Sequence, residues 1–434
     1  MRELDKVIGY ESIKNELYRF IDILQNPEKY KALGVSVPRG IMLDGDPGIG
    51  KTLMAQSIIK ESGRKAFVIR KDRADGDFID HIREVFEQAE KAAPSIVLLD
   101  DLDKFANEDD YHPNGEEYVT VQACIDSIKG KDVFVIATSN DGHKLPRSLV
   151  RSGRFDKVFS MTFPRNDDAK KIIAFYLKDK AVADDIDVDE IVRYSEGHSC
   201  ADLESVVNEA GILAGYGNKT SITQEDIRRA CFRKFWSFNE IGSEESADSL
   251  RRKAVHEAGH VVMAEFFDAG VVNFVSLEAR RGGCGALVSR RRDDNRKETF
   301  RDYEKSIMIS LAGKAATELI LGEIDAGVNA DIRNANDMIF SILDCNASYD
   351  FQSWGNEGYE TSQRVIENRD AVKNAEMARY YLKTKQILFC NREFLETVIE
   401  QLIEKKTLTY KDIAAIRGDV PVQVGDSSDI GFAA

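Results

Sequence analysis

The sequence predicts an α/β module with a parallel sheet and a small helical lid, followed by a mainly α-helical domain. Three observations predict this. Short apolar runs alternate with helical patterns up to about residue 163, which is typical of parallel strands with crossover helices. A glycine-rich segment, GDPGIGKT at 45–52, joins the first apolar run to a helix. All but one of the eight prolines fall at or before Pro164, so the second half is free to be helical.

Composition limits the classes of function. The chain has 434 residues, enough for two to four domains, and a formal net charge of −15, which argues against nucleic acid as a partner. No apolar run reaches the 18 residues that a membrane crossing needs, and residues 1–17 resemble neither a signal nor a transit peptide. The six cysteines form no CxxC pair, so we expect reduced core residues. We therefore expect a cytoplasmic protein without a transmembrane segment.

The glycine-rich segment follows a helix-bearing lead-in (1–38) and a short strand at 41–43. Its glycines let backbone N–H groups wrap phosphates, Lys51 reaches the β- and γ-phosphate oxygens, and Thr52 coordinates Mg²⁺. A glycine turn with a spare lysine is the alternative, which the flanking strand and helix disfavour. We therefore expect ATP and Mg²⁺ to be bound by Gly45, Asp46, Pro47, Gly48, Ile49, Gly50, Lys51 and Thr52.

Two further strands end in polar residues. A strand at 66–69 precedes a helix at 77–92, and the next strand, SIVLLDD, ends in Asp100 and Asp101, where parallel sheets place their ligands. Asp100 would hold Mg²⁺ and Asp101 would orient the attacking water. A strand at 133–138 leads to Asn140, which is either a sensor of the γ-phosphate or a turn residue before Asp141 and Gly142.

The next segment, LPRSLVRSGRFDKVF, precedes the last strand of the module. Arg151 and Arg154 could reach the nucleotide of a neighbouring subunit as arginine fingers, or form a solvated basic turn. We divide the chain into a large subdomain (1–163), a helical subdomain (164–241), an acidic linker (242–249), a metal-binding domain (250–417) and a disordered tail (418–434).

The segment 253–267 contains HEAGH and has helical periodicity, with an apolar stripe at Val255, Ala258, Val262 and Phe266. Asp248 or Ser249 can cap this helix. On a helix His256 and His260 lie one turn apart on one face and can share a Zn²⁺, with Glu257 beside the metal-bound water. The alternative is a coincidence of two histidines. The pattern is the core of a zinc peptidase.

After this helix, 273–278 and 282–291 are predicted strands, and helices are predicted from there to about residue 417. The strand near 285–289 could pair with a substrate backbone. The basic run from Arg290 to Lys297 is either a solvated loop or a site for an acidic partner surface.

With both sites in view, the chain resembles the FtsH-type AAA+ zinc metalloproteases over about 5–417. The resemblance rests on GDPGIGKT (45–52), FEQAEKAAPSIVLLDDLD (86–103), ATSN (137–140), LVRSGRFD (149–156), GHSCADLESVVNEA (197–210), HEAGH (256–260) and LAGKAATELILGEIDAGVNADI (311–332). It implies Asp331 as the third zinc ligand, and Glu318 as a partner of a ligating histidine. The residues alone do not single out Asp331.

The chain departs from this family at three places. Asp100-Asp101 stands where the family has Asp-Glu, so hydrolysis is expected to be slow. The aromatic pore loop that grips polypeptide is replaced by Ala74, Asp75 and Gly76, although Phe78 lies close by. The membrane segments that precede the family's ATPase module have no counterpart in this sequence.

We expect an ATP-dependent zinc metalloendopeptidase that unfolds and degrades proteins as a homohexamer. Two alternatives belong to other classes: a zinc peptidase with a weak or regulatory ATPase, which the Ala74-Asp75-Gly76 loop favours, and a remodelling chaperone with structural zinc, which Glu257 disfavours. A nucleic-acid ATPase is disfavoured by the charge of −15.

Overall fold

The computed structural model describes residues 2–34, 38–72, 75–106, 115–151, 153–236, 246–278, 287–290, 299–323, 328–345 and 363–423. The chain divides into two compact units, Met1–Ala230 and Cys231–Ala434, which we describe separately.

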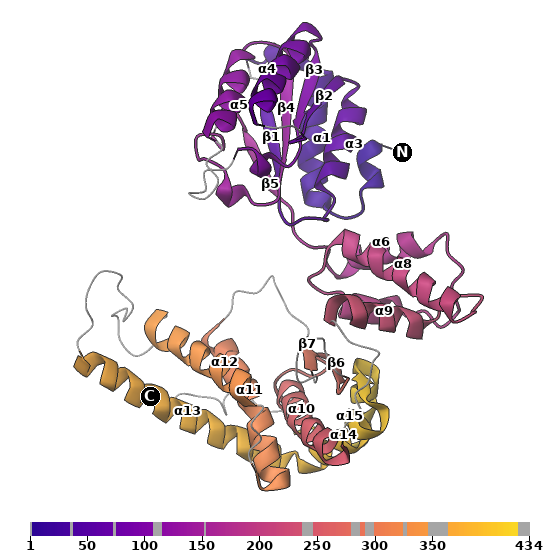
Figure 1. The fold of residues 1–434 in the computed structure, drawn as a ribbon, viewed down its shortest axis with the longest axis vertical. Helices are drawn as coiled ribbons and strands as arrows, with labels where there is room; N and C mark the ends of the chain where they lie inside the picture. The colour runs from indigo at the N-terminus through magenta and orange to yellow at the C-terminus, as the bar shows by residue number, and fades with distance from the viewer. Residues whose placement is uncertain are drawn as a thin grey trace. The chain divides into compact units, whose positions relative to one another are not determined.

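The first unit is built on a five-stranded parallel sheet (Figure 1). Its strand order is β2-β3-β4-β1-β5, and the predicted α/β fold is confirmed. The strands are β1 (Gly40–Asp44), β2 (Lys65–Ile69), β3 (Ser95–Leu99), β4 (Val133–Ser139) and β5 (Lys157–Ser160). The helices beside them are α1 (Glu11–Gln25), α2 (Pro27–Lys31), α3 (Lys51–Ser62), α4 (Asp75–Lys91) and α5 (Gly115–Ser127).

Helices cover both faces of this sheet. Because neighbouring strand residues point to opposite sides, each strand contributes side chains to two separate core clusters. Ile41 and Leu43 of β1 belong to a core cluster with α1 and α3, whereas Met42 belongs to a second cluster with α4 and α5. Figure 1 shows α1 and α3 on one side of the sheet and α4 and α5 on the other. The central strands β3 and β4 are buried at every residue, whereas the edge strands β2 and β5 are partly exposed. Parallel sheets of this kind bind ligands at the carboxyl ends of their strands.

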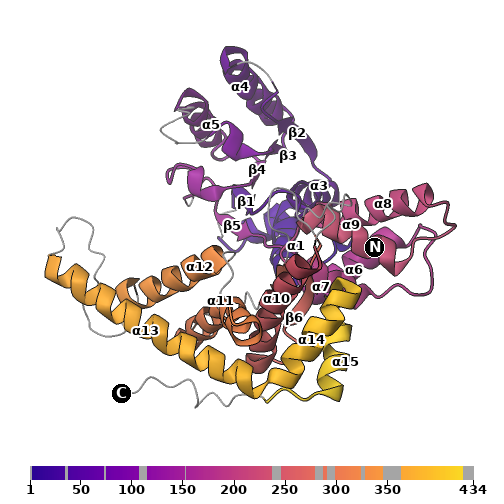
Figure 2. The ribbon, with the colours of Figure 1, turned by 60° about the horizontal axis from the view of Figure 1, so that its bottom comes forward.

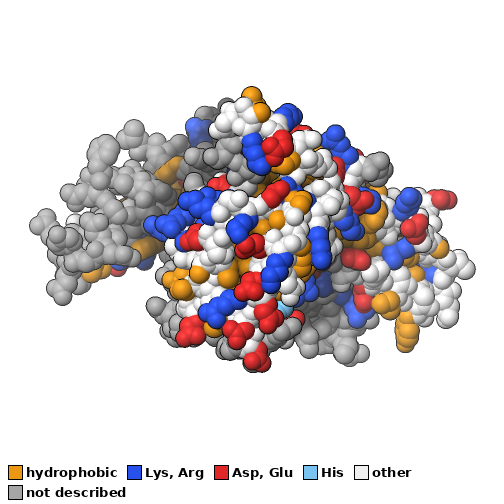
Figure 3. All heavy atoms as spheres, turned by 90° about the horizontal axis from the view of Figure 1, so that it is seen from above, with side chains coloured by type: hydrophobic (Ala, Val, Ile, Leu, Met, Phe, Trp, Pro, Cys, Tyr) orange, Lys and Arg blue, Asp and Glu red, His pale blue; other side chains and the backbone are white. Residues whose placement is uncertain are grey.

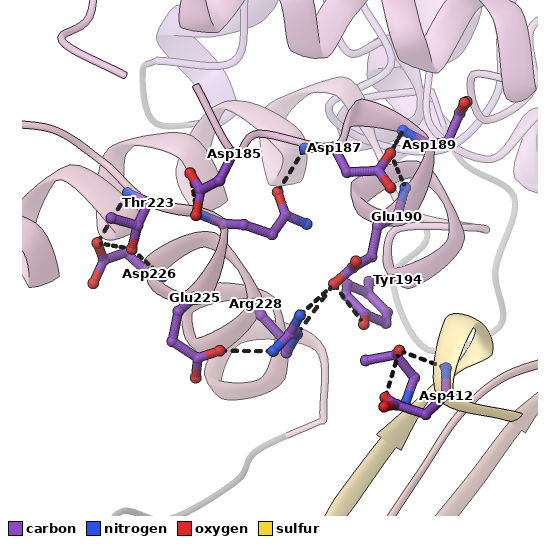
Figure 4. A network of polar contacts seen from close by, with 12 residues as sticks. Asp185, Asp187, Asp189, Glu190, Tyr194, Thr223, Glu225, Asp226, Arg228 and Asp412 are labelled. Carbon is purple, nitrogen blue, oxygen red and sulfur yellow. Dashed lines mark hydrogen bonds and ion pairs between the residues drawn. The ribbon is translucent and has the colours of Figure 1, made fainter. Parts of the chain in front are cut away.

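Four helices form the lid: α6 (Asn166–Leu177), α7 (Val188–Tyr194), α8 (Cys200–Tyr216) and α9 (Gln224–Trp236), the last of which begins in the first unit and continues into the second. Polar contacts fix α7 to α9 (Figure 4). Glu190, only 2% exposed, accepts hydrogen bonds from Arg228 Nε (3.1 Å) and Nη2 (2.9 Å), and from the hydroxyl of Tyr194 (2.9 Å). All three hydrogen bonds converge on Oε1 and pair the buried carboxylate with a cation, as a buried charge requires.

The second unit is mainly helical, as predicted. Its helices are α10 (Ala247–Phe267), α11 (Phe300–Leu321), α12 (Asn329–Phe340), a π-helical turn (Ser341–Cys345), α13 (Gln363–Cys390), α14 (Arg392–Lys405) and α15 (Tyr410–Asp419). Figure 2 shows α10 between α11 and α14. A small antiparallel sheet has the order β7-β6-β8, with β6 (Val272–Ser276), β7 (Leu287–Arg290) and β8 (Thr407–Thr409).

Several local predictions for this unit are wrong. Residues 407–409, predicted as helix, form β8, because the three residues pair with β6. Ser246, not Asp248 or Ser249, caps α10 by accepting the N–H of Ser249 at 3.2 Å. The last residues of the predicted linker therefore already belong to α10.

The helix that carries HEAGH is more buried than a one-sided stripe implies. In α10, residues 254–266 are all buried except His256. The helix therefore lies at the centre of its unit's core, which is why it is apolar on nearly every side.

Some predictions fall on residues outside the described part of the chain. These are Ala74, Gly285, most of the linker (242–245), the basic run after Arg290, and the tail from residue 424 onward; residues 418 and 419 of the predicted tail close α15.

None of the helices in the described ranges combines the length and apolarity of a bilayer-spanning segment. Figure 3 shows one face of the molecule, on which Lys and Arg side chains are interspersed with Asp and Glu side chains.

Candidate functional site

The glycine-rich loop closes around Lys51. Gly48 (φ 79°) and Gly50 (φ 98°) adopt left-handed conformations that turn successive backbone N–H groups toward one side. Nζ of Lys51 donates to the carbonyl oxygens of Gly45 (2.6 Å) and Asp46 (2.7 Å), and to Oδ1 of Asn140 (2.9 Å). Burial lowers the pKa of Lys51, although nearby carboxylates such as Asp101 oppose this shift.

Asp100 lies next to the hydroxyl expected to hold Mg²⁺. Its Oδ1 accepts hydrogen bonds from Thr52 (3.1 Å) and Thr138 (2.8 Å). Its Oδ2 accepts from Nε of Arg70 at 3.0 Å and from Nη2 of the same side chain. A carboxylate and a threonine hydroxyl side by side form the oxygen donor set that Mg²⁺ prefers.

Asp101 and Asn140 are hydrogen-bonded to each other beside Lys51. Asn140 Nδ2 donates to Asp101 Oδ1 at 3.1 Å, so the amide bridges Asp101 and Lys51. Burial alone would raise the pKa of Asp101, but the ammonium of Lys104, 2.6 Å away, holds it below its ordinary value. The two candidate residues thus meet, while their roles in hydrolysis stay predictions.

A cavity of about 510 Å³ opens beside these residues. It is lined by the glycine-rich loop, by Tyr10 near the start of the chain, and by Tyr176, Cys200 and Glu204 of the lid. A lining that combines phosphate donors with aromatic side chains suits a nucleotide. The residues present therefore fit Mg²⁺-ATP.

The two candidate arginine fingers differ in environment. Arg151 is exposed. Arg154 is 6% exposed and donates to both carboxylate oxygens of Asp126, from Nη2 at 2.8 Å and from Nε at 3.2 Å. Reaching a neighbouring subunit would require Arg154 to give up this bidentate pair, so Arg151 is the more available of the two.

Phe78 does not replace the missing pore aromatic. The side chain is fully buried and packs edge-to-face on Phe105, with ring centroids 5.2 Å apart. A gripping residue must be exposed, so the suggestion that Phe78 takes this role is wrong.

The metal ligands predicted from HEAGH converge with Asp331. His256 Nε2 lies 3.1 Å from Asp331 Oδ2 and 3.1 Å from His260 Nε2, and His260 Nε2 lies 3.5 Å from Asp331 Oδ2. These three ligand atoms form the one such group among the described residues. Asp331 comes from α12, 75 residues after His256, so the site depends on how three helices pack.

The protonation of these groups points to a cation. His260 Nδ1 lies 2.7 Å from the carbonyl oxygen of Ile309, to which it donates, so the neutral imidazole has its lone pair on Nε2. That lone pair faces His256 Nε2 and the Asp331 carboxylate. Burial would raise the pKa of Asp331, but the neighbouring His256 and His260 side chains bring it well below its ordinary value, so the carboxylate is ionised. Two imidazoles and a carboxylate fit Zn²⁺, and the hydrogen bond to Ile309 holds the imidazole of His260 in the orientation that this requires.

Two glycines allow this packing. A Cβ on Gly259 would lie 2.5 Å from the carbonyl oxygen of Ala312, so α10 and α11 approach closely only without a side chain there. A Cβ on Gly313 would lie 2.4 to 2.6 Å from ring atoms of His256. Gly313 therefore leaves the space in which the imidazole of His256 lies.

Glu257 and Glu318 have different places. Glu257, next to His256 in the chain, is 8% exposed and is not one of the three clustered ligands. Glu318 accepts from the hydroxyl of Tyr381 and from Lys385 Nζ (2.9 Å). The prediction that Glu318 contacts a ligating histidine is therefore wrong. The carbonyl oxygen of Ile309 orients His260 instead.

Sequence reasoning missed several residues of both sites. Arg70 and Lys104, which neutralise Asp100 and Asp101, belong to no motif that we recognised. Tyr10, Tyr176 and Glu204 line the cavity without any pattern that could have revealed them. For Gly313 a signal existed, since a glycine inside a helix often marks a close approach.

Comparison with known families agrees with this geometry. Residues 41–163 match the model of the ATPase family associated with various cellular activities (AAA). Residues 185–229 match the AAA+ lid domain, and residues 245–416 match peptidase family M41.

Curated relatives match along nearly the whole chain. ATP-dependent zinc metalloprotease FtsH 1 of Sorangium cellulosum is 29% identical, covering 97% of this chain and 73% of its own length. FtsH of the Aster yellows witches'-broom phytoplasma is also 29% identical (94% of this chain, 63% of its own length), and FtsH of Thermus thermophilus is 27% identical (96% and 70%). The chain belongs to the FtsH family of AAA+ ATP-dependent zinc metalloproteases.

Proposed function

We propose that this chain is an ATP-dependent zinc endopeptidase that unfolds proteins and cleaves them. The observation that carries the proposal is the convergence of His256, His260 and Asp331, with Glu257 beside them, in a chain that also has a nucleotide site. Three protein ligands leave a position open for water, which distinguishes a catalytic from a structural zinc site.

The chain's own residues divide the work of peptide hydrolysis. When bound, Zn²⁺ would polarise the scissile carbonyl and acidify a water. Glu257 takes the proton of that water and passes it to the leaving amine. Ile309 and Gly313 hold the two imidazoles in place, the first by its carbonyl oxygen and the second by the space it leaves. Strand β7, at the edge of its sheet among the described strands, offers backbone groups to an extended substrate.

The nucleotide site would drive substrate delivery. Lys51 and Thr52 hold the phosphates and Mg²⁺, Asp101 orients the attacking water, and Asn140 links Asp101 to Lys51. Arg151, exposed on the surface, would complete the site of a neighbouring copy in a homohexamer. We place the protein in the cytoplasm, because the six cysteines of the sequence form no CxxC pair and are spread over the whole chain, as is typical of reduced cysteines.

A cleavage assay tests the proposal. Purified chain is incubated with casein, with and without ATP, and with and without a zinc chelator. We expect ATP to accelerate cleavage, the chelator to stop it, and Lys51→Ala to lose the response to ATP while keeping its zinc.

Each of the other two functions predicts a different result. Cleavage that is the same without ATP would favour a zinc peptidase with a regulatory ATPase. ATP hydrolysis without any cleavage would favour a remodelling chaperone.

A further inference from the structure

The carboxylate expected to hold Mg²⁺ already has a cation of its own. Asp100 is 2% exposed and accepts four hydrogen bonds: from Thr52 and Thr138 on Oδ1, and from two nitrogens of Arg70 on Oδ2. An ionised carboxylate has about four lone-pair positions. The structure therefore leaves no acceptor position on Asp100 for the hydration shell of a metal ion.

The sheet itself brings Arg70 to this place. Strands β2 and β3 pair in parallel with Ile69 opposite Leu99, and the N–H of Asp100 donates to the carbonyl oxygen of Ile69 at 2.9 Å. Arg70 and Asp100 are the next residues of their strands, so their side chains leave the same edge of the sheet side by side. The contact is thus fixed by strand register and is more than a chance meeting of two surface side chains.

Of the three residues that are hydrogen-bonded to Asp100, Arg70 is the one that another cation can replace most easily. Thr138 is fully buried, and its hydroxyl also accepts the N–H of Asp101 at 2.8 Å. Thr52 belongs to the glycine-rich loop and is needed there for Mg²⁺. The Arg70 side chain, in contrast, is 60% exposed, so its guanidinium can turn into water at little cost once another cation neutralises Asp100.

We propose that Arg70 and Mg²⁺ compete for Asp100. In the nucleotide-free chain Arg70 supplies the positive charge that a buried carboxylate requires, and Mg²⁺ arriving with ATP takes over this charge and releases the guanidinium. Arg70 thereby sets the magnesium concentration at which nucleotide binds. The inference rests on the proposed use of ATP, and it makes Arg70 a positioning residue of the nucleotide site.

The test measures binding rather than turnover. Binding of a fluorescent, non-hydrolysable ATP analogue is titrated with Mg²⁺ for the wild-type chain, Arg70→Ala and Arg70→Gln. The control is Arg83→Ala, which removes an exposed arginine paired with Asp80 at 3.1 Å on α4. We expect both Arg70 variants to need at least about threefold less Mg²⁺ for half-maximal binding, because a competing charge is gone, and the control to match the wild type.

A second measurement uses thermal unfolding. Without nucleotide, Arg70→Gln should be less stable than the wild-type chain, because Asp100 is buried without a cation, and Mg²⁺ with the analogue should remove most of the difference. The glutamine side chain keeps a neutral donor, so Arg70→Gln decides the matter should Arg70→Ala fail to fold.

The inference is overturned if the Arg70 variants need as much Mg²⁺ as the wild-type chain, or more. A wild-type chain that shows no magnesium-dependent binding of the analogue would instead overturn the proposed ATP function, together with the inference that rests on it.

Discussion

The nucleotide site and the metal site differ in how their charged groups are satisfied. In the first, each functional side chain has a partner of opposite character: Lys51 has three oxygens, Asp100 has Arg70, and Asp101 has Lys104. In the second, His256, His260 and Asp331 face one another with ligand atoms 3.1 to 3.5 Å apart, and a backbone carbonyl accepts the hydrogen bond of the one N–H group of neutral His260. The nucleotide site is complete without its ligand, whereas the metal site requires a cation.

This difference predicts that the two sites tolerate change differently. A substitution in the metal site should act on metal occupancy or on one chemical step. Apart from Lys51, which the phosphates themselves require, a substitution in the nucleotide site should alter rates and ligand requirements by smaller factors.

The largest effect is expected for Glu257→Gln. It removes the base but no ligand, so cleavage of casein should fall by on the order of 10² to 10⁴-fold, while roughly one zinc per chain and near-normal ATPase activity remain. Peptide cleavage, elemental analysis and phosphate release measure the three quantities. Loss of zinc in this variant would show that Glu257 supports the metal and is not simply the base.

Gly313→Ala should weaken the binding of zinc. Its methyl group would overlap the ring of His256, so we expect zinc affinity to fall by about 10- to 100-fold. Competition with a zinc indicator measures the affinity. The matched control is Gly418→Ala in α15, where a Cβ meets nothing within 4 Å. If both variants bind zinc alike, the close contact between Gly313 and His256 is not what positions the ligand.

The buried position of Phe78 predicts that the chain unfolds stable substrate proteins poorly. Because Phe78 is not exposed near the start of α4, we expect ATP-dependent degradation of a stable folded domain to be at least about tenfold slower than that of casein, since little apolar surface is available to hold a moving chain. Degradation rates of a folded domain and of its destabilised variant give the comparison. Equal rates would point to a gripping residue elsewhere.

The smallest effect is expected at Asp101. A glutamate reaches one methylene further toward the attacking water, so Asp101→Glu should raise the ATPase rate by about two- to fivefold, and Asp101→Asn should retain bound ATP. Steady-state phosphate release and nucleotide retention on a desalting column measure these outcomes. A rate that neither substitution changes would assign the water to another residue.

Local pattern predicted much of the fold and part of each site. The strands β1 to β4 and the pair His256 and His260 follow from short-range spacing, since a helix or strand fixes the geometry of near neighbours. Asp331 could not be found in this way, because it meets the histidines only when α12 packs beside α10 and α11. Arg70 was missed for a related reason: its contact with Asp100 arises from the register of two strands.

Other errors have equally local causes. Strand β8 has three residues, too few for a pattern of its own, and forms because β6 offers an open edge. The cap of α10 was placed two or three residues late, because Asp248 and Ser249 are as suitable by type as Ser246. The burial of Phe78 depends on Phe105, which follows β3, so neighbouring residues in the sequence could not reveal it.

The central claim is that His256, His260 and Asp331 form a three-ligand zinc site. The most direct measurement is zinc content by elemental analysis, with X-ray absorption to identify the ligands, on the wild-type chain and on Asp331→Ala. We predict one zinc per wild-type chain, bound by two imidazole nitrogens and by oxygen, and a clear loss of zinc in Asp331→Ala. Full zinc occupancy with unchanged coordination in Asp331→Ala would contradict this ligand set.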